Sequence, residues 1–205
     1  MKNCKKIDLP LPPQEIIDEC LQSARLDNQE TIHYPRPPED VVDFSKRLDV
    51  PKKVAIDQFK PGELANYRMT KPPESLVAWC KENLPTYDRL AISHTFDGTC
   101  FMPHVDYKTK VSLNLYLKTN PAVSTWYKPK REFEYLIEDS AHPSYGQYLL
   151  SRLDLIESAV FEEGGWYLLN ASIPHSVEQI SGSRIFVRVC FDREEMFNYF
   201  PEVSL

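Results

Sequence analysis

The chain has 205 residues, of which 42% are hydrophobic, 12% aromatic and 26% charged, and its net charge at pH 7 is −6. This composition is typical of a globular protein, and the length suffices for one domain over residues 1–205 with its own core. The acidic balance argues against a general phosphate-binding surface, so nucleic acid is not an expected partner. No apolar run approaches the roughly 18 residues of a membrane span, so we expect no membrane insertion.

The N-terminus and the cysteines both indicate a reducing compartment. Residues 1–13 lack the apolar segment of a secretory signal. The five cysteines are scattered and contain no CxxC pair, a pattern that favours free thiols over a disulfide framework or a zinc ribbon. We therefore expect a cytoplasmic protein.

Residues 1–86 predict a helical buttress. Proline pairs open three segments in which apolar residues recur at helical spacing, 12–25, 37–48 and 72–84. Their apolar faces contain Ile16, Ile17, Cys20, Leu21 and Ala24 in the first segment, Val41, Phe44 and Leu48 in the second, and Leu76, Val77, Trp79, Cys80 and Leu84 in the third. Amphipathic helices of this kind need an apolar surface to cover.

Residues 87–205 predict that surface. Strand-like runs separated by turn signals occupy 87–96, 110–119, 124–128, 153–161, 166–170 and 184–191. Helices followed by many short strands favour an α+β, mainly β fold, an antiparallel sandwich or jelly roll braced by the N-terminal helices. The stretch 129–153 is an expected insertion, and long insertions at a barrel mouth often carry lids or binding loops.

Two of the predicted strands alternate between an apolar and a polar face. In 110–118, one face carries Val111, Leu113, Leu115 and Leu117, and the other carries Lys110, Ser112, Asn114, Tyr116 and Lys118. In 184–191, the apolar face is Ile185, Val187, Val189 and Phe191, and the opposite face is Arg184, Phe186, Arg188 and Cys190. Two interpretations stay open: the polar faces contact water, or they line a cavity while the apolar faces pack under the helices.

Three side chains form a candidate metal site. His104 and Asp106 lie two apart in FMPHVD, and His175 lies in PHSVE, after a glycine turn and a strand. Two imidazoles and a carboxylate leave open positions on a metal, which is the ligand set associated with non-haem Fe(II). On its own FMPHVD is more typical of an exposed loop, and the distant His175 is what favours a site.

The order of these elements resembles that of the Fe(II)/2-oxoglutarate-dependent oxygenases. The resemblance covers about Tyr87–Phe191. In chain order this stretch contains a strand, HxD, an alternating strand, a long gap, a glycine turn, another strand, the distal histidine and an arginine on the last strand. The stretch 164–191 looks most like prolyl-hydroxylase-like and aspartyl/asparaginyl β-hydroxylase-like members. The resemblance implies a cupin-like double-stranded β-helix, with Fe(II) held by His104, Asp106 and His175.

The resemblance also implies an activity. With Fe(II), 2-oxoglutarate and O₂, such an enzyme would hydroxylate an amino acid, a small metabolite or a protein side chain while 2-oxoglutarate is decarboxylated to succinate. Arg184, nine residues after His175, would hold the distal carboxylate of 2-oxoglutarate, because a guanidinium grips a carboxylate bidentately. Arg188 on the same strand face is the alternative. Phe186 stands where many relatives carry Ser or Thr, so a second contact to the cosubstrate must come from elsewhere.

The polar face of 110–118 offers candidates for this second contact. They are Lys110, Ser112, Asn114 and Tyr116. Lys110 is attractive because relatives often carry a basic residue just before this strand. A solvated lysine at a strand end is the alternative.

Other aromatic and histidine residues have weaker claims. Trp126 and Tyr127 would wall the substrate pocket, or else belong to the core. His94 shares a strand face with apolar residues and is expected to be a hydrogen-bonded core histidine. His33 and His142 lie in proline-rich loops, where we expect exposed side chains.

Two other functions stay open. A cupin-like metal enzyme that does not use 2-oxoglutarate would present a histidine-rich ligand set within one closely spaced motif, and Arg184 after the distal histidine argues against it. A β-helix that only binds or scaffolds would be expected to lose a metal ligand, whereas HxD…H is intact. The acidic balance and modest size favour a small molecule, an amino acid or a protein side chain over DNA as substrate.

Overall fold

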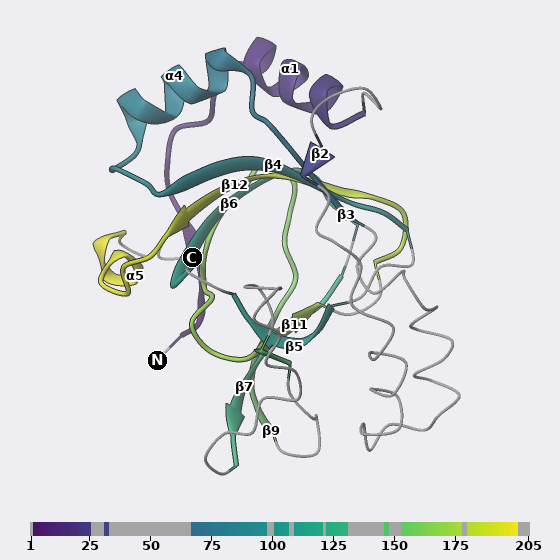
Figure 1. Ribbon diagram of the computed structural model, residues 1–205, viewed down its shortest axis with the longest axis vertical. Helices are drawn as coiled ribbons and strands as arrows, with labels where there is room; N and C mark the ends of the chain where they lie inside the picture. The colour runs from purple at the N-terminus through teal and green to yellow at the C-terminus, as the bar shows by residue number, and fades with distance from the viewer. Residues whose placement is uncertain are drawn as a thin grey trace.

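Two antiparallel sheets face each other in the computed structural model (Figure 1), which describes residues 2–25, 31–32, 67–97, 101–106, 109–120, 122–130, 146–147, 153–177 and 180–200. In the described chain, the larger sheet runs in the order β1 (Cys4–Ile7), β10 (Trp166–Asn170), β6 (Val111–Lys118), β12 (Arg184–Phe191), β4 (Arg89–Thr95), β3 (Tyr67–Thr70) and β2 (Thr31–Ile32). The smaller sheet runs in the order β8 (Gly146–Gln147), β5 (Phe101–Val105), β11 (His175–Val177), β7 (Ser124–Pro129) and β9 (Leu153–Ala159).

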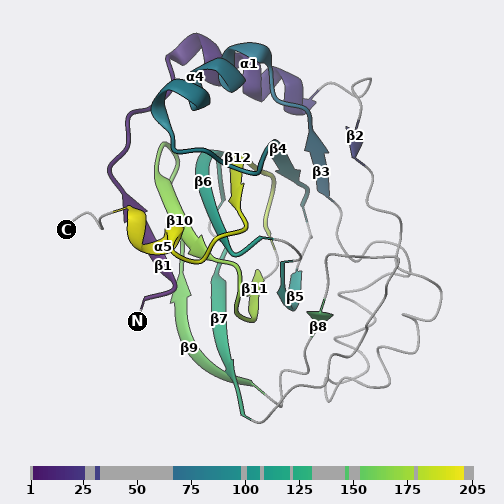
Figure 2. The ribbon, with the colours of Figure 1, turned by 60° about the vertical axis from the view of Figure 1, so that its left-hand side comes forward.

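The strand pairing is that of a double strand wound into a helix. Along the chain, β4, β5, β6 and β7 alternate between the larger and the smaller sheet. The chain then returns through β9, β10, β11 and β12, and each returning strand pairs antiparallel with its counterpart: β9 with β7, β10 with β6, β11 with β5 and β12 with β4. Figure 2 shows β7 and β9 side by side at the turning point of this winding. The predicted double-stranded β-helix is confirmed.

Two helices cover the outer face of the larger sheet, α1 (Gln14–Arg25) and α4 (Glu74–Asn83) (Figure 1). Their buried residues pack in one core cluster with the apolar faces of β6 and β12, including Cys20, Leu76, Leu113, Val187 and Val189. Burying these side chains against one another is the main contribution to stability at this face. The prediction that the N-terminal helices cover the apolar faces of both strands is therefore confirmed, while the predicted helix at 37–48 lies outside the described residues.

The first 86 residues also contribute strands that the sequence did not predict. Strand β1 pairs with β10 at one edge of the larger sheet, and β3 pairs with β4 toward the other. Both are short, and the partner of β1 lies at the far end of the chain. Pairing with a neighbouring strand of the sheet, rather than local propensity, determines their conformation. A last short helix, α5 (Met196–Tyr199), follows β12.

The predicted glycine turn joins β9 to β10. Gly164 has a positive φ of 73°, a conformation that a residue with a Cβ rarely adopts. The turn is tied to the central strand β6, because the Gly164 amide donates to the Tyr116 carbonyl at 2.8 Å and the Tyr116 amide donates to the Gly165 carbonyl at 3.2 Å.

None of the cysteines within the described ranges, Cys4, Cys20, Cys80 and Cys190, forms a disulfide, as predicted. Burial raises the pKa of Cys20 and of Cys80 to about 12. In the part of the chain that the structure describes, no helix has the length and apolar character that a membrane crossing requires.

Candidate metal and cosubstrate site

A cavity lies between the two sheets. The larger sheet lines it with Ser112, Asn114, Tyr116, Arg184, Phe186 and Arg188. The smaller sheet and its connections line it with Phe101, His104, Asp106, Trp126, His175 and Val177. The central residues of the polar faces of β6 and β12 therefore line a cavity, whereas Lys110 and Lys118 at the two ends of the β6 face are exposed. Of the two interpretations that the alternation left open, the cavity is correct.

His104 and His175 face each other across an antiparallel strand pair. They are register partners on β5 and β11, and their ring centroids are 4.4 Å apart. Asp106 follows β5 directly, and one donor atom from each of the three residues lies within 4.8 Å of the others. The exposed-loop interpretation of FMPHVD is wrong, because Phe101–Val105 is a strand and His104 is 6% exposed.

A hydrogen bond of Nδ1 fixes the orientation of the His175 imidazole ring. Nδ1 lies 3.0 Å from the carbonyl oxygen of Ile173, and since a carbonyl only accepts, Nδ1 carries the proton. Nε2 is then the atom that presents a lone pair to a metal. Burial, followed by the neighbouring His104, lowers the pKa of His175 to about 4. The imidazole is therefore neutral near pH 7, as a metal ligand must be.

The two carboxylate oxygens of Asp106 have different partners. Oδ1 lies 3.6 Å from His104 Nε2, whereas Oδ2 accepts a hydrogen bond from Arg188, which extends from the opposite sheet. Burial alone would raise the pKa of Asp106, but the guanidinium of Arg188 and the nearby imidazole of His104 hold it well below its usual range. The carboxylate is thus ionised, and Oδ1 is directed toward the histidines. Two imidazoles and one carboxylate fit Fe(II).

Arg184 is a buried cation in the same cavity. Its side chain is 3% exposed, and one terminal nitrogen donates to the Ala122 carbonyl at 3.1 Å. Its Nε has no hydrogen-bond partner, and among the described residues Arg184 forms no ion pair. Burial lowers its pKa, while Tyr116 acts in the opposite direction. A buried guanidinium with an unsatisfied donor is costly unless an anion binds it, so the residue fits the distal carboxylate of an oxo-acid.

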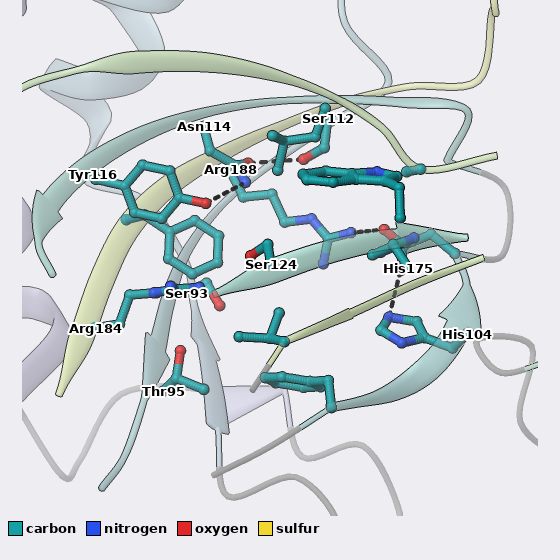
Figure 3. A pocket seen from close by; sticks show the side chains of 17 residues that line it. Ser93, Thr95, His104, Ser112, Asn114, Tyr116, Ser124, His175, Arg184 and Arg188 are labelled. Atoms are coloured by element: carbon teal, nitrogen blue, oxygen red, sulfur yellow. Dashed lines mark hydrogen bonds and ion pairs between the residues drawn. The ribbon is translucent and has the colours of Figure 1, made fainter. Parts of the chain in front are cut away.

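Three polar side chains on β6 are linked beside the arginines (Figure 3). Ser112 donates to the Oδ1 of Asn114 at 2.8 Å, and the Asn114 amide donates to the Tyr116 hydroxyl at 3.5 Å. Burial raises the pKa of Tyr116 to about 12, so the phenol keeps its proton. Its oxygen accepts from Asn114, so the O–H remains available as a donor. Three of the four candidates for a second cosubstrate contact therefore line the cavity.

Lys110 is the candidate that the structure does not bring to the cavity. It precedes β6, its side chain is 47% exposed, and its Nζ lies 3.5 Å from a carboxylate oxygen of Glu194. Its backbone amide donates to the Phe191 carbonyl. The alternation of the strand does not extend to this residue, so we correct the expectation of a cosubstrate contact: Lys110 is a solvated lysine.

The aromatic and histidine candidates separate clearly. Trp126 lines the cavity, is 1% exposed, and its indole N–H donates to the Asn170 carbonyl at 2.9 Å. Tyr127 forms a hydroxyl–hydroxyl hydrogen bond with Ser176 and is not part of the cavity wall. His94 is buried with Nδ1 3.0 Å from the Ala24 carbonyl, which confirms the expected core histidine. His33 and His142 lie outside the described residues.

Sequence reasoning missed several residues of the cavity wall. Ser93 and Thr95 on β4 line it, and their alternation with the core-facing His94 was a signal that could have found them. The sequence predicts Phe161 as the last residue of the strand 153–161, but β9 ends at Ala159. Phe161 contacts Arg184 from the segment that follows, behind the cavity wall.

No family model matches the chain, and no curated protein matches it. Among solved structures, the ribosomal oxygenase YcfD from Escherichia coli, in complex with cobalt and 2-oxoglutarate, aligns with a TM-score of 0.39 and 14% identity, over 67% of this chain and 32% of that one. Vicilin from hazelnut, Corylus avellana, aligns with a TM-score of 0.36 and 13% identity, over 62% and 30%. A point mutant of the oxalate decarboxylase OxdC of Bacillus subtilis aligns with a TM-score of 0.33 and 13% identity, over 68% and 27%.

This chain thus spans about a third or less of the length of each of these proteins. At TM-scores below 0.5, the likenesses carry no functional argument. What the chain does has to be inferred from its own cavity.

Proposed function

We propose that the chain is an Fe(II)/2-oxoglutarate-dependent dioxygenase that hydroxylates an amino acid, a small metabolite or a protein side chain, with decarboxylation of 2-oxoglutarate to succinate. One observation supports this above all. A three-residue metal site and the unsatisfied buried cation Arg184 line the same cavity. A cosubstrate with an oxo-acid group at one end and a carboxylate at the other is complementary to both.

Each residue of the proposed site has a defined role. His104, Asp106 and His175 would hold Fe(II) on one face and leave its remaining positions open. Arg184 would bind the distal carboxylate through its planar guanidinium, and Tyr116 would donate its O–H to the same group. With these in place, Fe(II) and 2-oxoglutarate supply the O₂ activation that hydroxylates a C–H bond.

Arg188 has a different role from Arg184. Because it already pairs with Asp106 Oδ2, it would orient the carboxylate so that Oδ1 faces the metal. We therefore retain Arg184 as the partner of the distal carboxylate. Arg188 remains close enough to the metal site to contact the oxo-acid end of the cosubstrate, and Asn114 is its register partner on β6.

The apolar residues of the cavity wall would exclude water from the reaction. Trp126 is buried beside His175, with ring centroids 6.5 Å apart. Phe101 and Phe186 line the cavity on opposite sheets. Apolar walls of this kind exclude water and strengthen the electrostatic contacts inside. Screening candidate amino acids, metabolites and peptides for succinate release would identify the substrate.

The test is spectroscopic. Protein purified without oxygen is mixed with Fe(II) and 2-oxoglutarate, and the weak visible charge-transfer band of the chelated cosubstrate is recorded. Wild type should show the band and His175→Ala should not, while His94→Gln, which changes a histidine outside the cavity, should retain it. Absence of the band in wild type, or an undiminished band in His175→Ala, contradicts the proposal.

A further inference from the structure

We propose that Phe161 is a positioning residue for the cosubstrate: its ring, with that of Tyr116, fixes the guanidinium of Arg184 and thereby determines which length of oxo-dicarboxylate the site accepts. The inference rests on the proposed function, because the position of Arg184 can select ligands by length only if the metal site binds the other end of the ligand. Phe161 does not line the cavity, so it acts through Arg184 and not by touching the ligand.

Phe161 belongs to a buried aromatic cluster behind the cavity wall. It is 3% exposed and lies between β9 and the glycine turn. Its ring stacks on Tyr116 with centroids 4.6 Å apart and planes 8° apart, and it meets Tyr167 edge-on at 4.9 Å. Contacts on two sides leave the ring little freedom to move.

Arg184 depends on these rings for its orientation. The guanidinium carbon is 5.4 Å from the ring centroid of Tyr116 and 5.6 Å from that of Phe161, both within the range of cation–π attraction. Its hydrogen bond to the Ala122 carbonyl is a single anchor, and no carboxylate of the described residues pairs with it. A single hydrogen bond leaves the planar group able to swing, and the second ring removes that freedom.

The segment that carries Phe161 is itself held in place. The two backbone hydrogen bonds between the 164–165 turn and Tyr116 attach it to the central strand β6. The amide of Glu162, the next residue, donates to the Tyr167 hydroxyl at 3.2 Å. The same strand that presents the Tyr116 hydroxyl to the cavity therefore also fixes the ring of Phe161.

The consequence is a defined depth for the carboxylate end of the ligand. The metal triad anchors the oxo-acid end on the smaller sheet, and Arg184 receives the other end on the larger sheet. If the guanidinium cannot move, an acid one carbon longer or shorter than 2-oxoglutarate loses either metal chelation or the bidentate contact. If it can move, the penalty for the wrong length falls.

The test is a double-mutant cycle on binding. Calorimetry on Mn(II)-loaded protein measures affinity for 2-oxoglutarate, oxaloacetate and 2-oxoadipate, so that no turnover is required. Phe161→Leu should weaken 2-oxoglutarate binding about 5- to 10-fold, as expected for a desolvated cation–π contact, and should reduce its preference over the other two acids. In an Arg184→Ala background, Phe161→Leu should cause no further change. Phe161→Tyr, which keeps the ring, should bind within twofold of wild type.

The matched control is Phe191→Leu. Phe191 lies on the same strand as Arg184, is fully buried in the core cluster under the helices, and should leave 2-oxoglutarate affinity within twofold of wild type. If the leucine variants do not fold, the affinities of Phe161→Tyr and Phe161→Met decide instead, and methionine should behave as leucine is expected to.

The outcomes separate the two proposals. If wild type does not bind 2-oxoglutarate at all, the proposed function is wrong. If wild type binds but Phe161→Leu has unchanged affinity and selectivity, or weakens binding equally with and without Arg184, the positioning role of Phe161 is wrong and the dioxygenase proposal stands.

Discussion

Arg188 and Asp106 pair across the cavity, from opposite sheets and from distant parts of the chain. The contact uses Oδ2 of the carboxylate and leaves Oδ1 beside His104. A residue of the larger sheet thus orients the carboxylate of a candidate metal ligand that follows β5. Mutation of a residue that orients a metal ligand in this way typically lowers metal affinity about 10- to 100-fold.

Removal of this partner should weaken metal binding. In Arg188→Ala, the buried Asp106 loses the cation that holds its pKa down, so a proton competes with the metal and the carboxylate is free to rotate. We expect Mn(II) affinity, measured by calorimetry, to fall about 10-fold or more, with a larger loss at pH 5.5 than at pH 8. Arg193→Ala, an exposed arginine beyond β12, should bind Mn(II) as wild type does. Equal or tighter binding in Arg188→Ala would contradict this role.

The two arginines should differ in steady-state kinetics. Arg184→Ala should raise the KM for 2-oxoglutarate at least tenfold, because a desolvated charge-assisted contact is lost, while Arg184→Lys recovers only part of it. Lys110→Ala is the matched control and should leave KM unchanged, since its side chain is solvated and paired with Glu194. Should Arg188→Ala alone raise this KM, the assignment of Arg184 is wrong.

Metal binding should stabilise the folded chain through His104, Asp106 and His175. A ligand that binds only the native state at 100 times its Kd adds about 2.7 kcal/mol, which is a shift of several degrees in Tm for a domain of this size. Wild type should show this shift with Mn(II), and a chelator should reverse it. His175→Ala should unfold at the same temperature with or without the metal.

For comparison, His94→Gln should have a lower baseline Tm, because it disturbs a buried hydrogen bond, yet retain the metal-dependent increase. A shift of equal size in His175→Ala would remove this residue from the metal site.

Alkaline pH should destabilise the helix–sheet interface. The pKa of Cys20 and of Cys80 is raised by burial from 9.0 to about 12, so the folded state holds a proton that the unfolded chain releases. Their stabilising contribution is complete below about pH 9 and is lost as pH rises toward 12, at up to about 1.4 kcal/mol per pH unit for each thiol. Urea unfolding between pH 8 and 10 should be less pH-dependent in Cys20→Ala than in wild type. An identical pH dependence would show that the thiol does not contribute.

Much of the fold could be predicted from periodicity alone. The predicted strands 166–170 and 184–191 coincide with β10 and β12, because short runs rich in aromatic and branched apolar residues are a strong local signal for a strand. Strand β5 was harder to recognise, since Pro103 lies within it and proline is rare inside strands. Its pairing with β11 and β8 on either side outweighs that local preference.

The candidate site likewise contains residues that the sequence could identify and residues that it could not. HxD and the distal histidine could be assigned to one candidate site because the order of the elements along the chain resembles that of a known family. The expectation for Lys110 came from the same resemblance and from extending an alternation past the start of its strand. The role of Phe161 could not be predicted, because its contact with Arg184 joins a loop to a strand and depends on three-dimensional packing. Sequence pattern indicates which face a residue occupies, and not which loop lies behind it.

The pairing of β5 with β11 also has a consequence for how the protein folds. His104 lies on β5 and His175 on β11, far apart along the chain. The long stretch of chain between them must close before they meet, and this closure has an entropic cost. A folding chain would acquire metal affinity only when this non-local closure is complete. The time at which metal binding develops during refolding would therefore report when β5 and β11 pair.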